Sequence, residues 1–235
     1  EVGARKMHAY FELHIEQGPI LEAEEKMIGV VTGVQGTRWY EVTGRGQESH
    51  TGATPMLLRK NALLGASRMI EATHQVGLSH LPGVASVGLI ENRPNSRNVV
   101  PGEVFFTVDL RHPDEAVLDK MEAAFRAALG PIAEAEMLTY EEKCIWKSPA
   151  VKFNAELIDC VRKGGAQAGY EMREMASGAG HDAAYIARVA PTTMIFVPCL
   201  GGISHNEAES TTFDECGAGS QVLLNAVLEY DQKFA

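Results

Sequence analysis

Between residues 36 and 145, segments with strand and helix periodicity follow one another in the order strand, helix, strand, strand, helix, strand. The strands are expected at residues 39–43, 84–91, 103–110 and 135–141, and the helices at residues 55–73 and 115–129. Thr54 and Asp114 stand where helix N-caps are expected, and Pro55 suits a first helical position. Because this order is typical of the split βαβ arrangement, we expect residues 36–148 to form a self-contained ferredoxin-like (βαββαβ) domain.

The two flanking segments are predicted to form one α/β layer that this domain interrupts. Strands are expected at residues 10–15, 27–34, 172–175 and 193–197, and helices at residues 154–168, 182–188 and 216–230. A length of 235 residues suits one large domain or two small ones. The predicted fold class is therefore α/β, with a partial α/β sandwich made of residues 1–35 and 149–235.

The charge balance narrows the possible partners. The formal net charge is -10, whereas nucleic acids and anionic membranes are bound by clustered Lys and Arg. No apolar stretch reaches the roughly 20 residues that cross a bilayer. The four cysteines are far apart and form no C-x-x-C pair, which favours free thiols in a reducing compartment. We therefore expect a cytoplasmic protein with a small-molecule partner, and neither nucleic acid nor membrane.

Two histidines follow predicted strands of the α/β layer. His14 lies at the end of the first strand, where alternation places Glu16 on the same face and Gln17 in the following turn. His205 lies in a glycine-rich loop after the last predicted strand. Taken alone, each also fits an ordinary hydrogen-bonded histidine. Taken together they favour a ligand site, because ligands of α/β sheets gather outside the carboxyl ends of strands.

Further candidates lie in a glycine loop and in the predicted ferredoxin-like domain. Residues 177–182 open a helix and can present amide N–H groups and the His181 imidazole to a carboxylate or carbonyl oxygen. In the ferredoxin-like domain the candidates are His50, Asn98 and Arg111. Arg111 can clamp a carboxylate with two hydrogen bonds, or it can form a surface ion pair with Asp109 or Asp114.

Five motifs occur in one order along the chain. They are HIEQGP (residues 14–19), SHTGATPM (49–56), RPNSRNVVPG (93–102), SGAGHDA (177–183) and ISHN (203–206). Together they resemble the N-carbamoyl-L-amino acid hydrolase, allantoate amidohydrolase and β-ureidopropionase group of the M20 metallopeptidase-like superfamily. The resemblance implies metal-dependent hydrolysis of a carbamoyl or ureido C–N bond.

The resemblance also implies roles for the candidates in the α/β layer, which would be the catalytic domain. His14 and His205 match metal ligands, one for each of two zinc or manganese ions. Gln17 and His181 match positions that contact the substrate. Imidazole and carboxylate ligands suit several divalent metals, so the choice between zinc and manganese stays open.

For the ferredoxin-like domain, the resemblance implies a lid that also makes a homodimer. Asn98 and Arg111 match a pair that grips the substrate carboxylate. His50 matches a histidine that reaches in from the partner subunit and stabilises the tetrahedral oxyanion. N-carbamoyl amino acids, allantoate and 3-ureidopropionate all carry a carboxylate, so the substrate within this class stays open.

One part of the pattern of that group is absent from the printed sequence. The group carries a metal-binding His, a bridging Asp and an adjacent pair of Glu upstream of the position of His14. We therefore expect this chain to be the C-terminal portion of such an enzyme, inactive alone and completed by an N-terminal half. The alternative is a non-catalytic dimerising or substrate-binding module of the same origin. A dipeptidase or acetyl-amino-acid deacylase is a third, weaker alternative.

Overall fold

The computed structural model describes residues 6–234, and the chain divides into two compact units. Unit 2 is Gly36–Ala150, and unit 1 is formed by Glu1–Gln35 together with Val151–Ala235. Unit 2 is thus an insertion in the chain of unit 1. Its second boundary lies at Ala150, two residues beyond the expected position 148.

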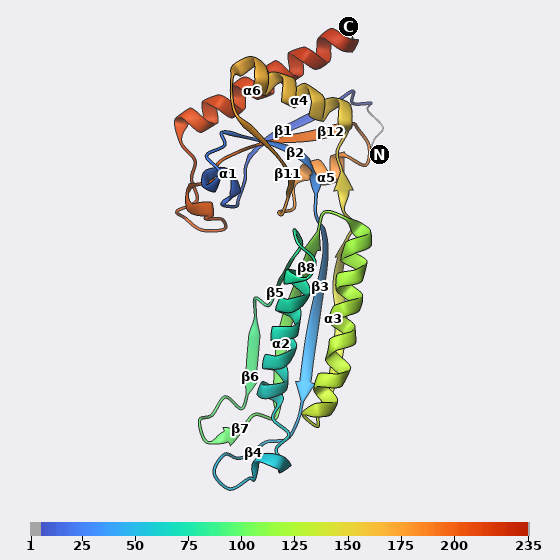
Figure 1. Cartoon of the computed structure of the whole chain (residues 1–235), viewed down its shortest axis with the longest axis vertical. Coiled ribbons are helices and arrows are strands. Elements are labelled where there is room, and N and C mark those ends of the chain that lie inside the picture. Colours follow the sequence, from blue (N-terminus) through green and yellow to red (C-terminus); the bar gives the residue numbers. More distant parts are fainter. Residues whose placement is uncertain (1–5, 235) are drawn as a thin grey trace. The chain divides into compact units, whose positions relative to one another are not determined.

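The main part of unit 2 is an antiparallel sheet with two helices side by side on one face (Figure 1). Its elements are β3 (Gly36–Arg45), β4 (Ser49–His50), the 3-10 turn η1 (Met56–Leu58), α2 (Ala62–Leu78), β5 (Val84–Ser86), β6 (Ile90–Arg93), β7 (Val99–Val100), β8 (Glu103–His112), α3 (Glu115–Ala135) and β9 (Thr139–Ser148). The strand order is β5-β8-β3-β9, with β6 also paired to β8, and β4 pairs with β7 in a small separate sheet. The predicted ferredoxin-like class is confirmed.

The core of unit 2 follows from strict alternation along its two central strands. In β8 every second residue is buried, and in β3 the buried residues include Tyr40 and Val42. These side chains face the helices, where the Tyr40 and Phe125 rings lie 5.2 Å apart between centroids. The other residues of β3 and β8 face away from the helices, so this sheet has one covered and one open face.

The start of α2 differs from the prediction. The helix begins at Ala62 with Asn61 as its N-cap, and the predicted cap Thr54 is followed only by the short turn η1. Pro55 adopts an extended ψ of 145°, which interrupts helical geometry. Asn61 accepts hydrogen bonds from the backbone N–H groups of Leu63 and Leu64. Pro55 therefore precedes the separate turn η1 and is not the first residue of α2.

The observed N-cap at Asn61 predicts different effects for two substitutions. Asn61→Ala should lower the free energy of unfolding of unit 2 by about 1 kcal/mol, because it removes the acceptor for two N–H groups. Thr54→Ala should change it by less than about 0.5 kcal/mol. Both tryptophans of the chain, Trp39 and Trp146, lie in unit 2, so denaturant unfolding followed by tryptophan fluorescence measures this unit. Equal losses in the two variants would contradict the observed cap.

Two further boundaries in unit 2 differ from the prediction. The predicted strand at 84–91 is two strands, β5 and β6, and the strand predicted from residue 135 begins at Thr139. The preceding helix was expected to end at residue 129. Instead α3 continues to Ala135, because Ala133 is buried against the sheet and keeps the last turn in place. Asp114 caps α3 as predicted.

Unit 1 is a mixed sheet with helices on both faces. Its elements are β1 (Tyr10–Ile15), α1 (Ile20–Ala23), β2 (Ile28–Val34), β10 (Val151–Lys152), α4 (Ala155–Ala168), β11 (Met172–Ser177), α5 (Asp182–Ile186), β12 (Thr192–Val197), the 3-10 turn η2 (Leu200–Gly202) and α6 (Phe213–Phe234). The strand order is β1-β12-β2-β10, with β11 also paired to β2. β1 and β12 are parallel, whereas β12 and β2 are antiparallel.

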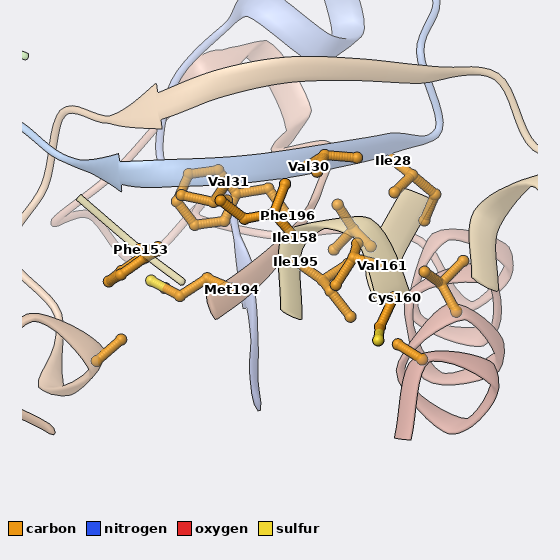
Figure 2. Packing of buried hydrophobic residues seen from close by; sticks show 14 of the residues in the cluster. Ile28, Val30, Val31, Phe153, Ile158, Cys160, Val161, Met194, Ile195 and Phe196 are labelled. Atoms are coloured by element: carbon orange, nitrogen blue, oxygen red, sulfur yellow. The ribbon is translucent and has the colours of Figure 1, made fainter. Parts of the chain in front are cut away.

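Alternation along β1 assigns the two faces of this sheet. Phe11 packs edge-on against Tyr230 of α6, with ring centroids 6.2 Å apart. Glu12 points to the other face, where it accepts a hydrogen bond from the backbone N–H of Ala183 in α5. Figure 2 shows part of the apolar cluster, with Ile158 and Val161 of α4 beside Ile195 of β12. All six residues of β12 are buried. Among residues 6–234, no helix is long and apolar enough to cross a membrane.

Candidate functional site

The carboxyl ends of β1 and β12 carry the predicted residues of unit 1. Because the two strands are parallel, with Ile15 opposite Val197, their ends lie at the same edge of the sheet. The backbone N–H of Glu16 donates to the carbonyl of Val197 over 2.9 Å, which extends the pairing beyond the strands. The turn after β1 and the loop after β12 therefore start from neighbouring positions.

His14 is oriented by a backbone hydrogen bond. Its Nδ1 lies 2.8 Å from the carbonyl oxygen of Ile15. A carbonyl only accepts hydrogen bonds, so Nδ1 carries the proton and Nε2 carries the lone pair. Metal-binding histidines are commonly held in this way, with one nitrogen bonded to a carbonyl and the other available to the ion. His14 therefore has the tautomer of a metal ligand.

His181 lies beside His14, a contact between residues far apart in the sequence. The two ring centroids are 4.6 Å apart, and the Phe196 ring is 5.5 Å from His181. His181 Nε2 is 2.7 Å from the hydroxyl of Ser177. Burial and, secondly, the neighbouring His14 lower the pKa of His181 to about 4. His181 is therefore neutral near pH 7 and has one donor and one acceptor nitrogen.

Glu12 also belongs to this group, although it was not among the predicted site residues. Its carboxylate accepts hydrogen bonds from the Tyr10 hydroxyl, at 3.0 Å, and from the backbone N–H of Ala183, at 2.9 Å. Burial and the Glu12 carboxylate raise the pKa of Tyr10 to about 12. Glu12 thereby fixes the start of α5, which directly follows His181. The signal was available, since strand alternation places Glu12 on the same face as His14.

Gln17 and the ISHN loop are brought together. The Gln17 side-chain amide donates to the hydroxyl of Ser204 over 2.9 Å. Gln17 and His205 have φ angles of 58° and 56°, in the left-handed region that non-glycine residues adopt at a cost of about 1 kcal/mol or more. The backbone N–H of His205 donates to the carboxylate of Glu209. Both turns are thus held in strained conformations by side-chain contacts, and the His205 side chain is exposed.

Glu16 has a structural role in unit 1. It is buried, and its two carboxylate oxygens accept the backbone N–H groups of Ile20 and Leu21, each at 2.8 Å. These bonds hold the first turn of α1. The carboxylate predicted to share a face with His14 is therefore occupied in capping this turn.

His50 and Asn98 are neighbours in unit 2. His50 pairs with Val99 across the two short strands β4 and β7, and the Thr51 N–H donates to the Asn98 carbonyl over 3.1 Å. His50 Nδ1 accepts the backbone N–H groups of Gly52 and Ala53, at 3.0 and 3.1 Å. Nδ1 is thus the acceptor nitrogen, and a neutral His50 carries its proton on Nε2, from which it can donate.

Arg111 forms an ion pair with Asp109, which was one of the two predicted alternatives for this residue. Its Nη2 lies 2.6 Å from Oδ2 of Asp109, and Nε lies 3.0 Å from Oδ1. Both side chains are partly exposed, at 26% and 31%. The guanidinium is therefore held over the open face of the sheet. Its five N–H donors allow it to bind a second carboxylate beside Asp109.

The structure separates Arg111 from the His50 and Asn98 pair. Arg111 lies eight residues along β8 from Glu103, or about 26 Å at strand spacing. The β4 and β7 pair lies beyond the Glu103 end of the sheet, near β6 (Figure 1). The course of α2 supports the same separation. The N–H of its first residue, Ala62, donates to the carbonyl of Pro101, whereas its last turn packs against β5, the strand that pairs with β8 at Arg111. Asn98 and Arg111 therefore do not form a pair within one copy of the chain.

The described residues include no group of three or more His, Cys, Asp and Glu side chains placed to hold a metal ion. His14 has a suitable tautomer, and His205 has an exposed imidazole in a fixed turn. Zinc sites usually need three or four protein ligands. The two histidines fit a metal site that other ligands complete.

Comparisons with known proteins show the family of the chain. A model described as Peptidase family M20/M25/M40 matches residues 1–229. The chain is 51% identical over 230 residues to an N-carbamoyl-L-amino-acid amidohydrolase from Rhizobium meliloti, covering 97% of this chain and 55% of that protein. It is 37% identical over 219 residues to the allantoate amidohydrolase of Escherichia coli, covering 92% and 53%.

Solved structures show the same likeness. The crystal structure of an amidase of the hydantoinase/carbamoylase family from Burkholderia multivorans matches with a TM-score of 0.95 and 54% identity, over 96% of this chain and 55% of that one. This chain therefore spans about half the length of the relatives that it matches.

Proposed function

The chain belongs to peptidase family M20/M25/M40, and on that premise we propose that it is the C-terminal portion of a metal-dependent amidohydrolase. The proposed reaction is hydrolysis of the carbamoyl or ureido C–N bond of an N-carbamoyl-L-amino acid or a related ureido acid, such as allantoate or 3-ureidopropionate. Relatives named for N-carbamoyl-L-amino acid and allantoate hydrolysis support this substrate class.

The observation that carries the proposal is the state of His14. Its protonated Nδ1 is bound to the Ile15 carbonyl, which leaves Nε2 as a ligand nitrogen at the carboxyl edge of the sheet. We propose that His14 and His205 each bind one of two divalent ions, zinc or manganese. Such ions would polarise the substrate carbonyl and lower the pKa of a water molecule. The remaining ligands and the general base would come from an N-terminal half, without which the chain is inactive.

The residues of this chain would then bind and orient the substrate. Neutral His181, beside His14, and the Gln17 amide would contact the ureido group. Arg111 would bind the substrate carboxylate with parallel hydrogen bonds. His50 would donate from Nε2 to the oxyanion that develops at the attacked carbonyl, with Asn98 beside it.

We propose a homodimer through unit 2, and the positions of these groups support it. A small ureido acid cannot span the separation of Arg111 from the His50 and Asn98 pair, since Arg111 is about 26 Å from Glu103 and the pair lies beyond that end of β8. We propose that each site takes Arg111 from one copy and His50 with Asn98 from the other.

The four cysteines are free thiols, which favours a reducing, cytoplasmic location.

Hydrolysis by this chain joined to the proposed N-terminal half, called the longer protein below, tests the proposed reaction. With an N-carbamoyl-L-amino acid, each turnover should consume one water and release one amino acid, one ammonia and one carbon dioxide. Dialysis against a chelator should stop ammonia release, and added zinc or manganese should restore it. A protein that contains the N-terminal half and releases no ammonia from any of the three ureido substrates, with either metal, would contradict the proposal.

A further inference from the structure

The open face of the unit 2 sheet carries an apolar group that the proposed reaction does not use. Trp39, Ile145 and Trp146 are 39%, 43% and 47% exposed, although they lie in strands of a sheet whose other face is covered. The two tryptophan rings are 6.2 Å apart between centroids. Large apolar side chains gathered on an exposed sheet face indicate a binding surface.

Strand register places this group beside the Arg111 ion pair. Trp39 of β3 is opposite Asp109 of β8 on one side and opposite Trp146 of β9 on the other. Ser86 of β5 is also opposite Asp109. One residue from each of four neighbouring strands therefore forms a row across the sheet, called the Asp109 row, with the members Ser86, Asp109, Trp39 and Trp146. Arg111 is two residues along β8 from Asp109, on the same face, and its guanidinium reaches back to the Asp109 carboxylate.

A β-bulge creates the apolar wall of this surface. The register between β3 and β9 shifts at Trp39 and Tyr40, which pair with Trp146 and Cys144. Cys144 packs against the core on the helix side, and Lys147 reaches Glu122 of α3 on that same side. The two residues between them therefore both face the open side, whereas regular alternation would expose only one. Bulges of this kind re-aim side chains next to functional sites.

Part of this group, with Trp39, Asp109 and Ile145 among its members, lines a cavity. It has a volume of about 300 Å³, and its lining includes Trp39, Ser86, Gly88, Thr107, Asp109 and Ile145. This volume is at the lower end of the range of small-ligand sites, and the combination of apolar walls with few polar groups is typical of them. Asp109, the carboxylate in the lining, is paired with Arg111. Glu41, two residues from Trp39 on the same strand face, disfavours an acidic ligand group.

We propose that this cavity is the subsite for the substrate side chain, and that it selects N-carbamoyl amino acids with apolar or aromatic side chains. The proposal rests on the proposed function, since it takes Arg111 as the carboxylate anchor. A substrate held there by its carboxylate has its α-carbon next to the Asp109 row, so its side chain reaches the wall formed by Trp39 and Ile145. Allantoate carries a second, polar ureido group at this position and 3-ureidopropionate carries no side chain, so neither places an apolar group in the cavity.

The two tryptophans of the chain, Trp39 and Trp146, make the test direct, because both lie in this row. The emission of the 235-residue chain is titrated with N-carbamoyl-L-leucine and with N-carbamoylglycine. The leucine compound should change the emission saturably, with a Kd about tenfold or more below that of the glycine compound. A similar Kd for the two compounds, or saturable binding measured by calorimetry without any change in emission, would overturn the subsite. So would an absence of binding.

A matched pair of variants tests the wall. Ile145→Ser should reduce the preference for the leucine compound to about twofold and leave the Kd of N-carbamoylglycine unchanged. Leu57→Ser, at a 90% exposed residue in η1, should change neither Kd. If Ile145→Ser keeps the full preference, the proposal is wrong. If it instead converts a dimer to a monomer in light scattering, the face is a contact between copies and the proposal is also wrong.

Turnover by the longer protein separates this proposal from the proposed function. Hydrolysis with no preference for the leucine compound would reject the subsite and leave the amidohydrolase assignment intact. Discrimination in the binding titration without any hydrolysis would reject the assignment and leave an apolar carboxylate site.

Discussion

Replacing His14 by alanine in the longer protein should abolish metal-dependent hydrolysis and remove one of the two bound ions. The imidazole is held with Nε2 as its ligand nitrogen by the Ile15 carbonyl, so its loss removes a ligand and not merely a support. Losing a residue that only supports a ligand costs roughly 10- to 100-fold in metal affinity or activity, so we expect a loss above that range. Metal content by mass spectrometry and ammonia release are the measurements.

His80 provides a matched control. Its Nδ1 lies 2.8 Å from the carbonyl oxygen of Val76, the same distance as in His14, and it is also partly buried, but it lies in unit 2. His80→Ala should therefore keep both ions and keep kcat/KM within about threefold of the parent protein. If His14→Ala retains two ions and full activity, His14 is an ordinary hydrogen-bonded histidine and the proposed metal site is wrong.

Two inactive variants should restore activity when they are mixed. In the proposed dimer, each site takes Arg111 from one copy and His50 from the other. Arg111→Gln and His50→Ala should each lose most activity in isolation, since one removes the carboxylate anchor and the other the oxyanion donor. Subunits exchanged between the two variants form mixed dimers in which one site is intact and the other carries both changes. Random exchange should restore about a quarter of the parent activity.

The alternative arrangement gives a different result. If every site took both residues from the same copy, no mixed dimer would contain an intact site and mixing would restore nothing. The control mixes Arg111→Gln with Arg111→Lys, which no exchange can complement. Light scattering before mixing checks that both variants remain dimeric. Restored activity in the control would show that the recovery has another cause.

The fold was largely predictable because alternation and capping determine it locally. β8 alternates without a break over ten residues, and Asp114 stands directly before a long amphipathic helix, so strand, turn and helix were all visible in the sequence. The errors occurred where a local signal had two meanings. Pro55 suits the first turn of a helix, yet it is also compatible with the extended conformation that it adopts before η1. The second helix was expected to end at residue 129, yet α3 continues through Pro131 to Ala135 with Ala133 buried.

The sequence indicated which residues are candidates for the site, but not which of them lie next to one another. His14 and His181 were selected from separate motifs, and only the fold shows that their rings meet. The contact between Arg111 and Asp109 was visible as an alternative, because residues two apart share a strand face. The distance of Arg111 from His50 and Asn98 could not be predicted, since it depends on strand register. The bulge at Ile145 had no sequence signal that we recognised.

The central claim is that this chain is one portion of a two-part catalytic unit, and metal content measured together with turnover tests it most directly. Both are measured on the 235-residue chain alone and on the same chain joined to the proposed N-terminal half. We predict no turnover of N-carbamoyl-L-amino acids and less than one ion per chain for the chain alone, and turnover with about two ions per chain for the joined protein. Equal turnover by the two proteins, or a joined protein without metal and without turnover, would contradict the claim.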